Sequence, residues 1–421
     1  MDSKQLAEAI TYGGIESTNF FNGRLLSGED LTREQEANRE ARRRLGQAVG
    51  NGIAYGLEVS APKDVDTRQT PMVRIEAGMA VNGRGETLVL GKPVQVSLVR
   101  QPDAETAGTP ADLFKDCLPP QAGVYVADAG VYLLAISPAA ARSGRAPVSG
   151  LGNITASCNT RYTVESVQFR LIQIPLTAQE LAVGNAKLLR NQLAYKCFGY
   201  GAVRSFIANL FDTMPDHYGA IDDLPASRLS DCDVPLALLY WTTTGGINFI
   251  DLWSVRRRLA PKPASEEWSV FVGERRVREG EAMFLQFQEQ VRSLLANDAT
   301  PHNIIAKEHF ERLPPVGILP IATKSLKGFD YLKFFEGVTY REPAYLEGAR
   351  VESLLRYSFS YAPVELGSGE MLWLYWVSEN VQEMLKSALP VQTALIFSSG
   401  QMPYAAAPRF DVSQWNYSSP V

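Results

Sequence analysis

Hydrophobic positions recur with a period of two over much of the chain, which is the spacing of β-strands. From Ile53 onward this pattern covers residues 53–59, 73–81, 87–90 and 94–98. The stretch Asn82-Gly83-Arg84-Gly85-Glu86 separates two of these runs and predicts a tight hairpin. We therefore expect a small β-domain over residues 53–100.

A second β-rich domain is expected over residues 119–262. Its strand-like runs are residues 131–136, 162–174, 234–241 and 247–252. Between them, Thr177-Ala178-Gln179-Glu180 has the form of a capping box, in which the first and fourth side chains satisfy free backbone groups at a helix start. We therefore expect a helical insertion near residues 178–212.

In the remaining residues, 263–421, the hydrophobic pattern predicts a helix followed by a mixed domain. Phe284, Phe287, Val291 and Leu294 are spaced by three and four, so a helix over residues 279–296 would carry one apolar seam. Strands are expected at 371–377 and 393–397, and a short helix at 347–357. Together these patterns predict an α+β fold that is predominantly β.

The N-terminal part, residues 1–52, predicts an arm and a polar helix. Ser27 and Asp30 form an approximate capping box, and the helix is expected to end at Gly50. A polar helix of this length is marginal alone, so we expect it to lie across another subunit or along an exposed edge. The expected interface residues are Phe20, Phe21, Leu25, Leu26, Leu31, Arg42, Arg43 and Leu45.

Composition and charge narrow the classes of function. Of 421 residues, 45% are hydrophobic and 21% charged, which is typical of a globular chain. The formal net charge is −5, so there is no basic balance of the kind that nucleic-acid-coating proteins show. We therefore expect no nucleic-acid partner. We also expect no signal peptide, because the N-terminus has no basic segment followed by an apolar run, and no membrane span, because no long uninterrupted apolar stretch occurs.

Candidate chemistry is sparse. The four cysteines are far apart and lack metal-binding spacing, so we interpret them as small buried residues in a reducing compartment. Two disulfides are the alternative, although nothing in the sequence asks for them. His217 follows Asp216 directly, which does not orient it as a catalytic base. The acidic loop over residues 222–233 offers oxygen ligands for calcium, or is a solvated loop. We expect that the protein is not an enzyme and that it binds neither a cofactor nor a metal ion.

Two arginine runs have two interpretations each. Residues 256–258 and 275–276 carry Arg side chains whose planar groups suit the carboxylates or phosphates of a partner. The same runs also fit a solvated face with local ion pairs.

Several segments together resemble a known group of proteins. The segment from Phe20 to Gln35 is similar to an F-x-G-x-L-L-T-x-x-D-L-x-x-E-Q opening found in baseplate and tail-fibre-associated components of contractile phage tails and extracellular contractile injection systems. Residues 50–59 and 75–90 resemble the glycine-rich strand and hairpin that follow that opening, and residues 310–321 resemble its L-P-P-x-G-x-L-P stretch. In residues 54–55 the chain departs from the commonest pattern.

The resemblance implies a structural component of a contractile injection machine at or near the baseplate, not an enzyme. Its partners would be other baseplate or tail proteins, with self-association into a homo-oligomer as a further expectation. It would assemble in the cytoplasm and then form part of a tail-like particle. The alternatives are a receptor- or carbohydrate-binding tail fibre module and a glycan hydrolase, which needs two carboxylates about 5–10 Å apart.

Overall fold

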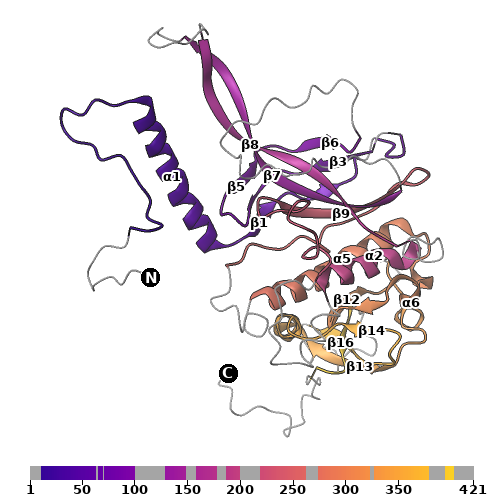
Figure 1. The fold of residues 1–421 in the computed structure, drawn as a ribbon. Helices are drawn as coiled ribbons and strands as arrows, with labels where there is room; N and C mark the ends of the chain where they lie inside the picture. Colours follow the sequence, from indigo (N-terminus) through magenta and orange to yellow (C-terminus); the bar gives the residue numbers. More distant parts are fainter. Residues whose placement is uncertain are drawn as a thin grey trace, which may run out of the picture.

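Strands hold more residues than helices in the computed structural model of the protein, so the fold is α+β and predominantly β, as expected (Figure 1). The structure describes residues 11–62, 65–69, 71–99, 129–147, 158–177, 186–199, 219–261, 274–322, 327–378 and 394–402. His217 and most of the expected helical insertion lie outside these residues.

Two small antiparallel sheets follow the N-terminal helix. One has the order β1 (Gly52–Gly56), β4 (Gly78–Val81), β5 (Thr87–Leu90), and the other has the order β2 (Val59–Ser60), β3 (Met72–Ile75), β6 (Val94–Ser97). The hairpin between β4 and β5 is confirmed. Its turn is closed by the Asn82 side-chain oxygen, which accepts hydrogen bonds from the backbone N–H groups of Arg84 (3.1 Å) and Glu86 (2.9 Å).

A larger antiparallel sheet packs on these two. Its order is β10 (Gly246–Asp251), β9 (Val234–Thr242), β7 (Gly130–Pro147), β8 (Cys158–Ile174). Ile75 and Leu88 from the small sheets lie in one hydrophobic cluster with Leu134 and Leu239 from the large one. The expected small and large β-regions therefore share one core, because each sheet has a single apolar face to bury.

The opposite face of this sheet is covered by helix α2 (Ala186–Phe198), whose Leu189 and Leu193 pack against Val131 and Leu238. Helix α5 (Glu274–Asn297) lies beyond α2, between it and a second four-stranded sheet (Figure 1). That sheet has the order β12 (Val316–Pro320), β16 (Ala394–Ser399), β15 (Leu372–Ser378), β13 (Tyr340–Glu347), with β13 parallel to β15.

Helix α5 confirms the expected helix but begins earlier. Phe287 and Val291 of the apolar seam are buried with Phe310 and Phe397, whereas Phe284 is only half-buried. The other face of the second sheet is covered by α8 (Val351–Ser358), which confirms a short helix there. The remaining short elements are η3 (Pro301–Asn303), α6 (Ala306–His309), β11 (Arg312–Leu313), α7 (Tyr331–Phe334), η4 (Gly348–Arg350) and β14 (Val364–Glu365).

The cysteines differ from the expectation. Cys197 on α2 is a free thiol, and its burial raises its pKa to about 12, so it is an unreactive core residue. Cys232 is disulfide-bonded to a cysteine whose side chain lies outside the described residues. The expectation of four reduced cysteines is wrong for Cys232, and disulfides are typical of an oxidising compartment.

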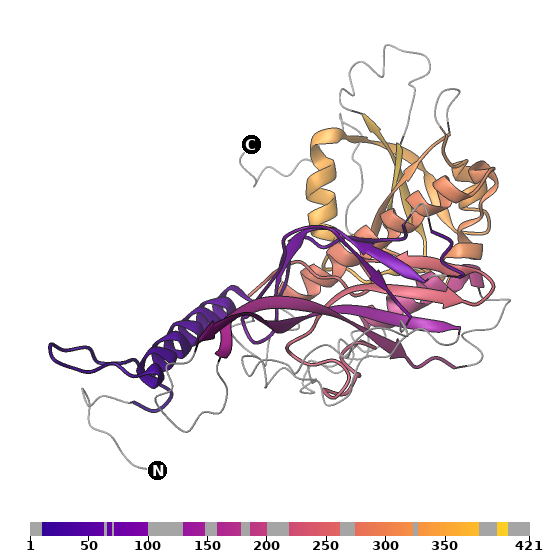
Figure 2. The same cartoon turned by 90° about the horizontal axis from the view of Figure 1, so that it is seen from above.

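Two segments project from this body. Strands β7 and β8 stay paired as far as Pro147 and Cys158, but β9 accompanies β7 only from Gly130 to Ile136, so the outer part is a two-stranded ribbon. Helix α1 (Gly28–Val49) runs beside the ribbon (Figure 2), and Arg39 lies 3.8 Å from Glu165. Among the described residues, no hydrophobic cluster includes residues 11–49 or 137–166.

A buried ion pair fastens the base of the ribbon. Arg170 of β8 donates to Asp233 across 2.5 Å, and both side chains are almost fully buried. The same carboxylate accepts a hydrogen bond from Ser137 of β7 and one from the Ser230 backbone N–H at 2.8 Å. Because all these donors converge on Asp233, its charge stays compensated away from water.

The first prediction concerns this pair. Replacing Asp233→Ala leaves Arg170 buried without its counter-charge, which should lower the free energy of unfolding by about 3–5 kcal/mol. The double variant Arg170→Met with Asp233→Leu removes both charges and should lose much less. Urea denaturation of both variants measures the difference, and an equal loss in the two would contradict a charge-compensation role.

Candidate functional site

The arm that precedes α1 is held by polar contacts to the start of the helix. A turn is closed by the Arg24 backbone N–H, which donates to Phe21 O at 3.2 Å, and the Arg24 guanidinium donates to Asp30. Ser27 caps the helix and Asp30 reciprocates, so the expected capping box is confirmed. Hydrogen bonds from Ser27 are the main cause of the lowered pKa of Asp30, with Arg24 adding to the effect.

The arm then runs along the helix through further polar contacts. The Thr18 hydroxyl donates to the Asp30 carbonyl at 2.9 Å, and its backbone N–H donates to Glu34 at 3.3 Å. Arg44 donates to the Gly13 carbonyl at 2.7 Å. The side of α1 that contacts the arm is therefore polar, except for the buried Ala37.

The C-terminal half of α1 rests on the β4–β5 hairpin by close backbone contact. A Cβ placed on Gly46 would lie 2.1 Å from the Gly85 carbonyl oxygen, so only glycine permits this approach. Gln47 donates to the Arg84 carbonyl at 3.2 Å, and Arg43 lies 3.9 Å from Glu86. These contacts position the helix, and no hydrophobic cluster of the described residues includes a residue of α1.

The apolar side chains of arm and helix face outward instead. The expected interface residues are placed as follows: Phe20, Phe21, Leu25, Leu26, Leu31, Leu45 and Arg42 are exposed, whereas Arg43 is half-buried and pairs with Glu40 and Glu86. Sequence reasoning did not include Tyr12, Ile15 and Val49, which are also exposed. Nine of the seventeen exposed large hydrophobic side chains of the described residues thus lie in residues 11–49.

Within α1 the exposed apolar residues form one line. Leu31 and Leu45 are fourteen residues apart, which is close to four helical turns, and Val49 follows Leu45 by about one turn. Asn38 lies midway on the same line. An ordinary surface helix buries its apolar side and exposes its polar side. Helix α1 differs from this, because its large apolar side chains are exposed, on a line that also carries Asn38 and Arg42.

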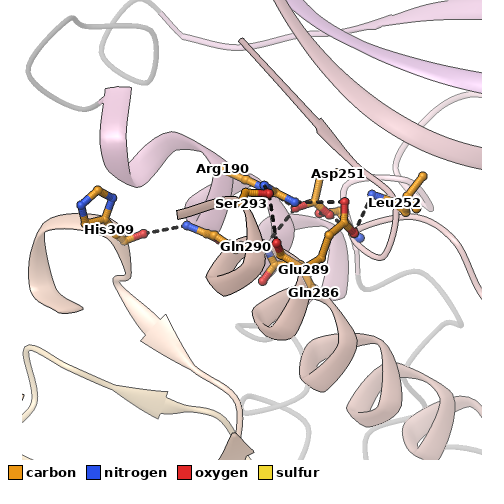
Figure 3. A network of polar contacts seen from close by, with 9 residues as sticks. Arg190, Asp251, Leu252, Gln286, Glu289, Gln290, Ser293 and His309 are labelled. Carbon is orange, nitrogen blue, oxygen red and sulfur yellow. Dashed lines mark hydrogen bonds and ion pairs between the residues drawn. The ribbon is translucent and has the colours of Figure 1, made fainter. Parts of the chain in front are cut away.

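A second feature, a buried polar junction, joins the two halves of the molecule (Figure 3). Arg190 of α2 donates to Asp251 of β10 at 2.6 Å, lies 3.1 Å from Glu289 of α5, and reaches Ser293 at 3.1 Å. Gln286 of α5 donates to the same Asp251 at 2.9 Å. One guanidinium thus connects three elements that come from distant parts of the sequence.

The junction extends to the segment after α5. Gln290 donates to the His309 carbonyl at 3.1 Å (Figure 3). Asn191, next to Arg190 on α2, accepts hydrogen bonds from the backbone N–H groups of Glu311 and Arg312 and donates to the Arg312 carbonyl at 3.0 Å. An amide that saturates both sides of a short segment holds that segment in one register.

Burial sets the charge of this junction. It raises the pKa of Glu289 to about 8, with the Asp251 charge adding to the rise and Arg190 opposing it. At neutral pH Glu289 is therefore mostly protonated, and Arg190 and Asp251 form a compensated pair. Burial also lowers the pKa of His309 and so favours the neutral ring.

A recess of about 430 Å³ opens beside the junction. Its described lining residues are Lys187, Arg190, Phe249, Gln290, Ser293, Leu294, Asn297, Asp298, Ala299 and His309. Asp298 is the one carboxylate among them, and Asp251 and Glu289 are not part of the lining. The described lining of this recess therefore holds no pair of carboxylates of the kind that the hydrolase alternative requires.

Other sequence candidates are placed in structural roles. Arg256 is buried and donates to the Leu57 carbonyl at 3.0 Å, while Arg257 and Arg258 pair with Glu279 and Glu281. The expected ion pairs are present, with Arg256 lying 3.6 Å from Glu58, but Arg256 is buried and not on a solvated face. The side chains of Arg275 and Arg276 lie outside the described residues.

The acidic loop is also tied internally. The Asp233 carboxylate is used by Arg170, and Asp222 accepts a hydrogen bond from the Gly219 backbone N–H at 3.2 Å. No cluster of three metal-ligating side chains occurs within the described ranges. Among the helices of the described residues, none combines the length and apolarity needed to cross a membrane.

Comparisons with known proteins place the chain in no family. No family model matches it, and no curated protein does. A crystal structure of TssK is similar with a TM-score of 0.23 and 8% identity, over 67% of this chain and 52% of the TssK chain. The chain thus spans about half the length of the structure it matches, and a likeness this low assigns no function.

We expect Gly46→Ala to weaken the contact that holds α1 on the β4–β5 hairpin. In an exposed helix interior this change normally stabilises by up to about 1 kcal/mol. Here the added Cβ meets the Gly85 carbonyl, so amide hydrogens of α1 should exchange faster with solvent. Gly28→Ala is the matched control, because a Cβ there meets nothing within 4 Å. Unchanged exchange in Gly46→Ala would contradict the close contact.

Glu289 should make the stability of the junction depend on pH. Its pKa is raised from 4.5 to about 8 in the folded chain, so the stabilisation is complete below pH 4.5 and is lost as the pH rises toward about 8. Glu289→Gln stays neutral and should remove this decline. Urea midpoints measured from pH 5 to about pH 9 test this, and parallel curves for the two proteins would refute it.

Proposed function

We propose that the protein is a structural component of a contractile phage-tail-like injection machine, at or near the baseplate. In this proposal it docks on a neighbouring baseplate or tail protein through the arm and α1. The motif resemblance over residues 19–98 and 310–321 supports the class of machine. The structural support comes from the arm and α1 alone.

The observation that carries the docking role is the outward position of the large apolar side chains of α1. Its contacts with the body and arm are polar, while Leu31, Leu45 and Val49 face solvent together with Phe20 and Phe21 of the arm. Burying apolar area is the dominant favourable term in protein association. A surface that is apolar, ordered and directed away from its own core therefore fits a partner protein.

The lack of a local core favours the same role. Helix α1 has 22 residues, of which only Ala37 is buried. Isolated polar helices of this length are marginal in water, and most helical stability comes from tertiary packing. Contact with a neighbouring subunit would supply the packing that the chain itself does not.

The alternative, a carbohydrate- or receptor-binding fibre module, would be favoured by aromatic side chains along one rim. Tyr345 and Tyr357 are exposed in the C-terminal half, but they do not share a face. Leu346 packs with Leu354 of α8, so its neighbour Tyr345 points to the opposite face of β13. These two described tyrosines therefore form no common shelf, and the docking proposal has the stronger support.

The test is incorporation into particles from the producing cell. We expect the double variant Leu31→Glu with Leu45→Glu to be absent from purified particles, because it places charges on the docking line. Leu332→Glu is the matched control, since Leu332 is equally exposed on α7. Mass spectrometry of the particles, with crosslinking from Arg42→Lys as a new amine on the same face, identifies the neighbour.

Normal incorporation of the double variant into particles would contradict the docking role of α1. Recovery of the wild-type chain only as a free species, with no sheath, tube or baseplate proteins, would instead refute the assignment to a contractile machine.

A further inference from the structure

We propose that a second copy of this chain adds to the outer edge of β8, antiparallel, with a two-fold axis at Thr163. The residues of this edge are not those of the exposed line of α1, so the inference goes beyond the docking role and does not depend on it. It rests on the edges of the ribbon, on its exposed side chains and on the order of residues 161–165.

The ribbon has two edges, and the β8 edge is the one without proline. Beyond Ile136 no described strand lies beside β7, but Pro138 and Pro147 on β7 lack the backbone N–H that a neighbouring strand would need. Strand β8 is at the edge of its sheet, with β7 as its one described neighbour. From Arg161 to Ser166 it has no proline or glycine. Long edges without such protection pair readily with other strands.

The side chains on this part of β8 are suited to a covered surface. Tyr162 is 54% exposed and Val164 is 45% exposed, and alternation places both on the same face of the ribbon. A two-stranded ribbon alone is marginally stable in water. Pairing the β8 strands of two copies would join their ribbons into one four-stranded sheet. The ribbon therefore gains most from a partner that is itself a strand.

The order of residues makes β8 complementary to itself. When two copies pair antiparallel about Thr163, Arg161 lies opposite Glu165 of the second copy, and Tyr162 lies opposite its Val164. Thr163 meets the second Thr163. Opposite charges, an aromatic with a β-branched residue, and two threonines are the cross-strand pairs that stabilise antiparallel sheets. By symmetry each unlike pair occurs twice.

Neighbouring registers lose this match. Centring the pair on Tyr162 places Arg161 opposite Thr163, and centring it on Val164 places Arg161 opposite Val167. A parallel, in-register pair would place like charges side by side, which is destabilising. The charges are available for pairing: Glu165 is well exposed, and its nearest cation, Arg39, is 3.8 Å away.

Charge reversal tests the register in the full-length protein. We expect sedimentation equilibrium to show a dimer of the wild type. Arg161→Glu alone and Glu165→Arg alone should each weaken it about tenfold, because each creates two like-charge pairs about the axis. The double variant Arg161→Glu with Glu165→Arg restores both opposite pairs and should dimerise like the wild type.

Disulfide trapping gives an independent readout. Thr163→Cys places two thiols opposite each other at the axis, so it should form a covalent dimer under mild oxidation. Ala141→Cys is the control, since Ala141 is exposed on β7, across the ribbon from the proposed interface. The wild-type chain, oxidised in the same way, is a second control that measures how many covalent dimers form through the native cysteines.

A wild type that stays monomeric at all soluble concentrations would overturn the proposal. So would a double charge reversal that is as weak as the single ones, or covalent dimers that form equally from Ala141→Cys. Each of these outcomes leaves the α1 docking role intact, because incorporation into particles is measured separately.

Discussion

The Arg190 guanidinium is the buried charge around which the two halves meet, and next to it Ala194 and Phe198 of α2 pack with Met283 of α5. It lies between a carboxylate of the larger antiparallel sheet, Asp251, and a carboxyl group of α5, Glu289, and its own side chain is buried. A buried charge is tolerated only where partners surround it, so α2, β10 and α5 must keep one relative position. Because Glu289 is mostly neutral at pH 7, the junction has one compensated ion pair and no net buried charge.

Helix α1 and the ribbon project from the body that this junction holds together. Each hydrophobic cluster of the described residues lies in the body, while the projecting parts are held by polar contacts at their bases. Their exposed side chains, Leu31 and Leu45 on α1 and Tyr162 and Val164 on β8, belong to two different elements. A component with one surface for a neighbour and one for its own copy would set both position and copy number in an assembly.

Local signals allowed good prediction of elements. The capping box of Ser27 and Asp30, the hairpin turn at Asn82 and the apolar seam of α5 each depend on residues within a few positions of one another. The apolar character of the arm was also visible in the sequence. The sequence also led us to expect Leu31 at an interface, but which side of α1 packs on the arm and on the β4–β5 hairpin depends on tertiary contacts.

The sequence by itself determined the fold class, most strands and the start and end of α1, since these follow from periodicity and short-range hydrogen bonding. The tertiary structure alone decided which long-range partners each residue meets. It placed Arg256 inside the fold, joined Arg190 to Asp251 and Glu289, and turned the apolar line of α1 outward. The physical reason is that contacts between residues far apart in the chain depend on how whole faces are buried, which no local pattern encodes.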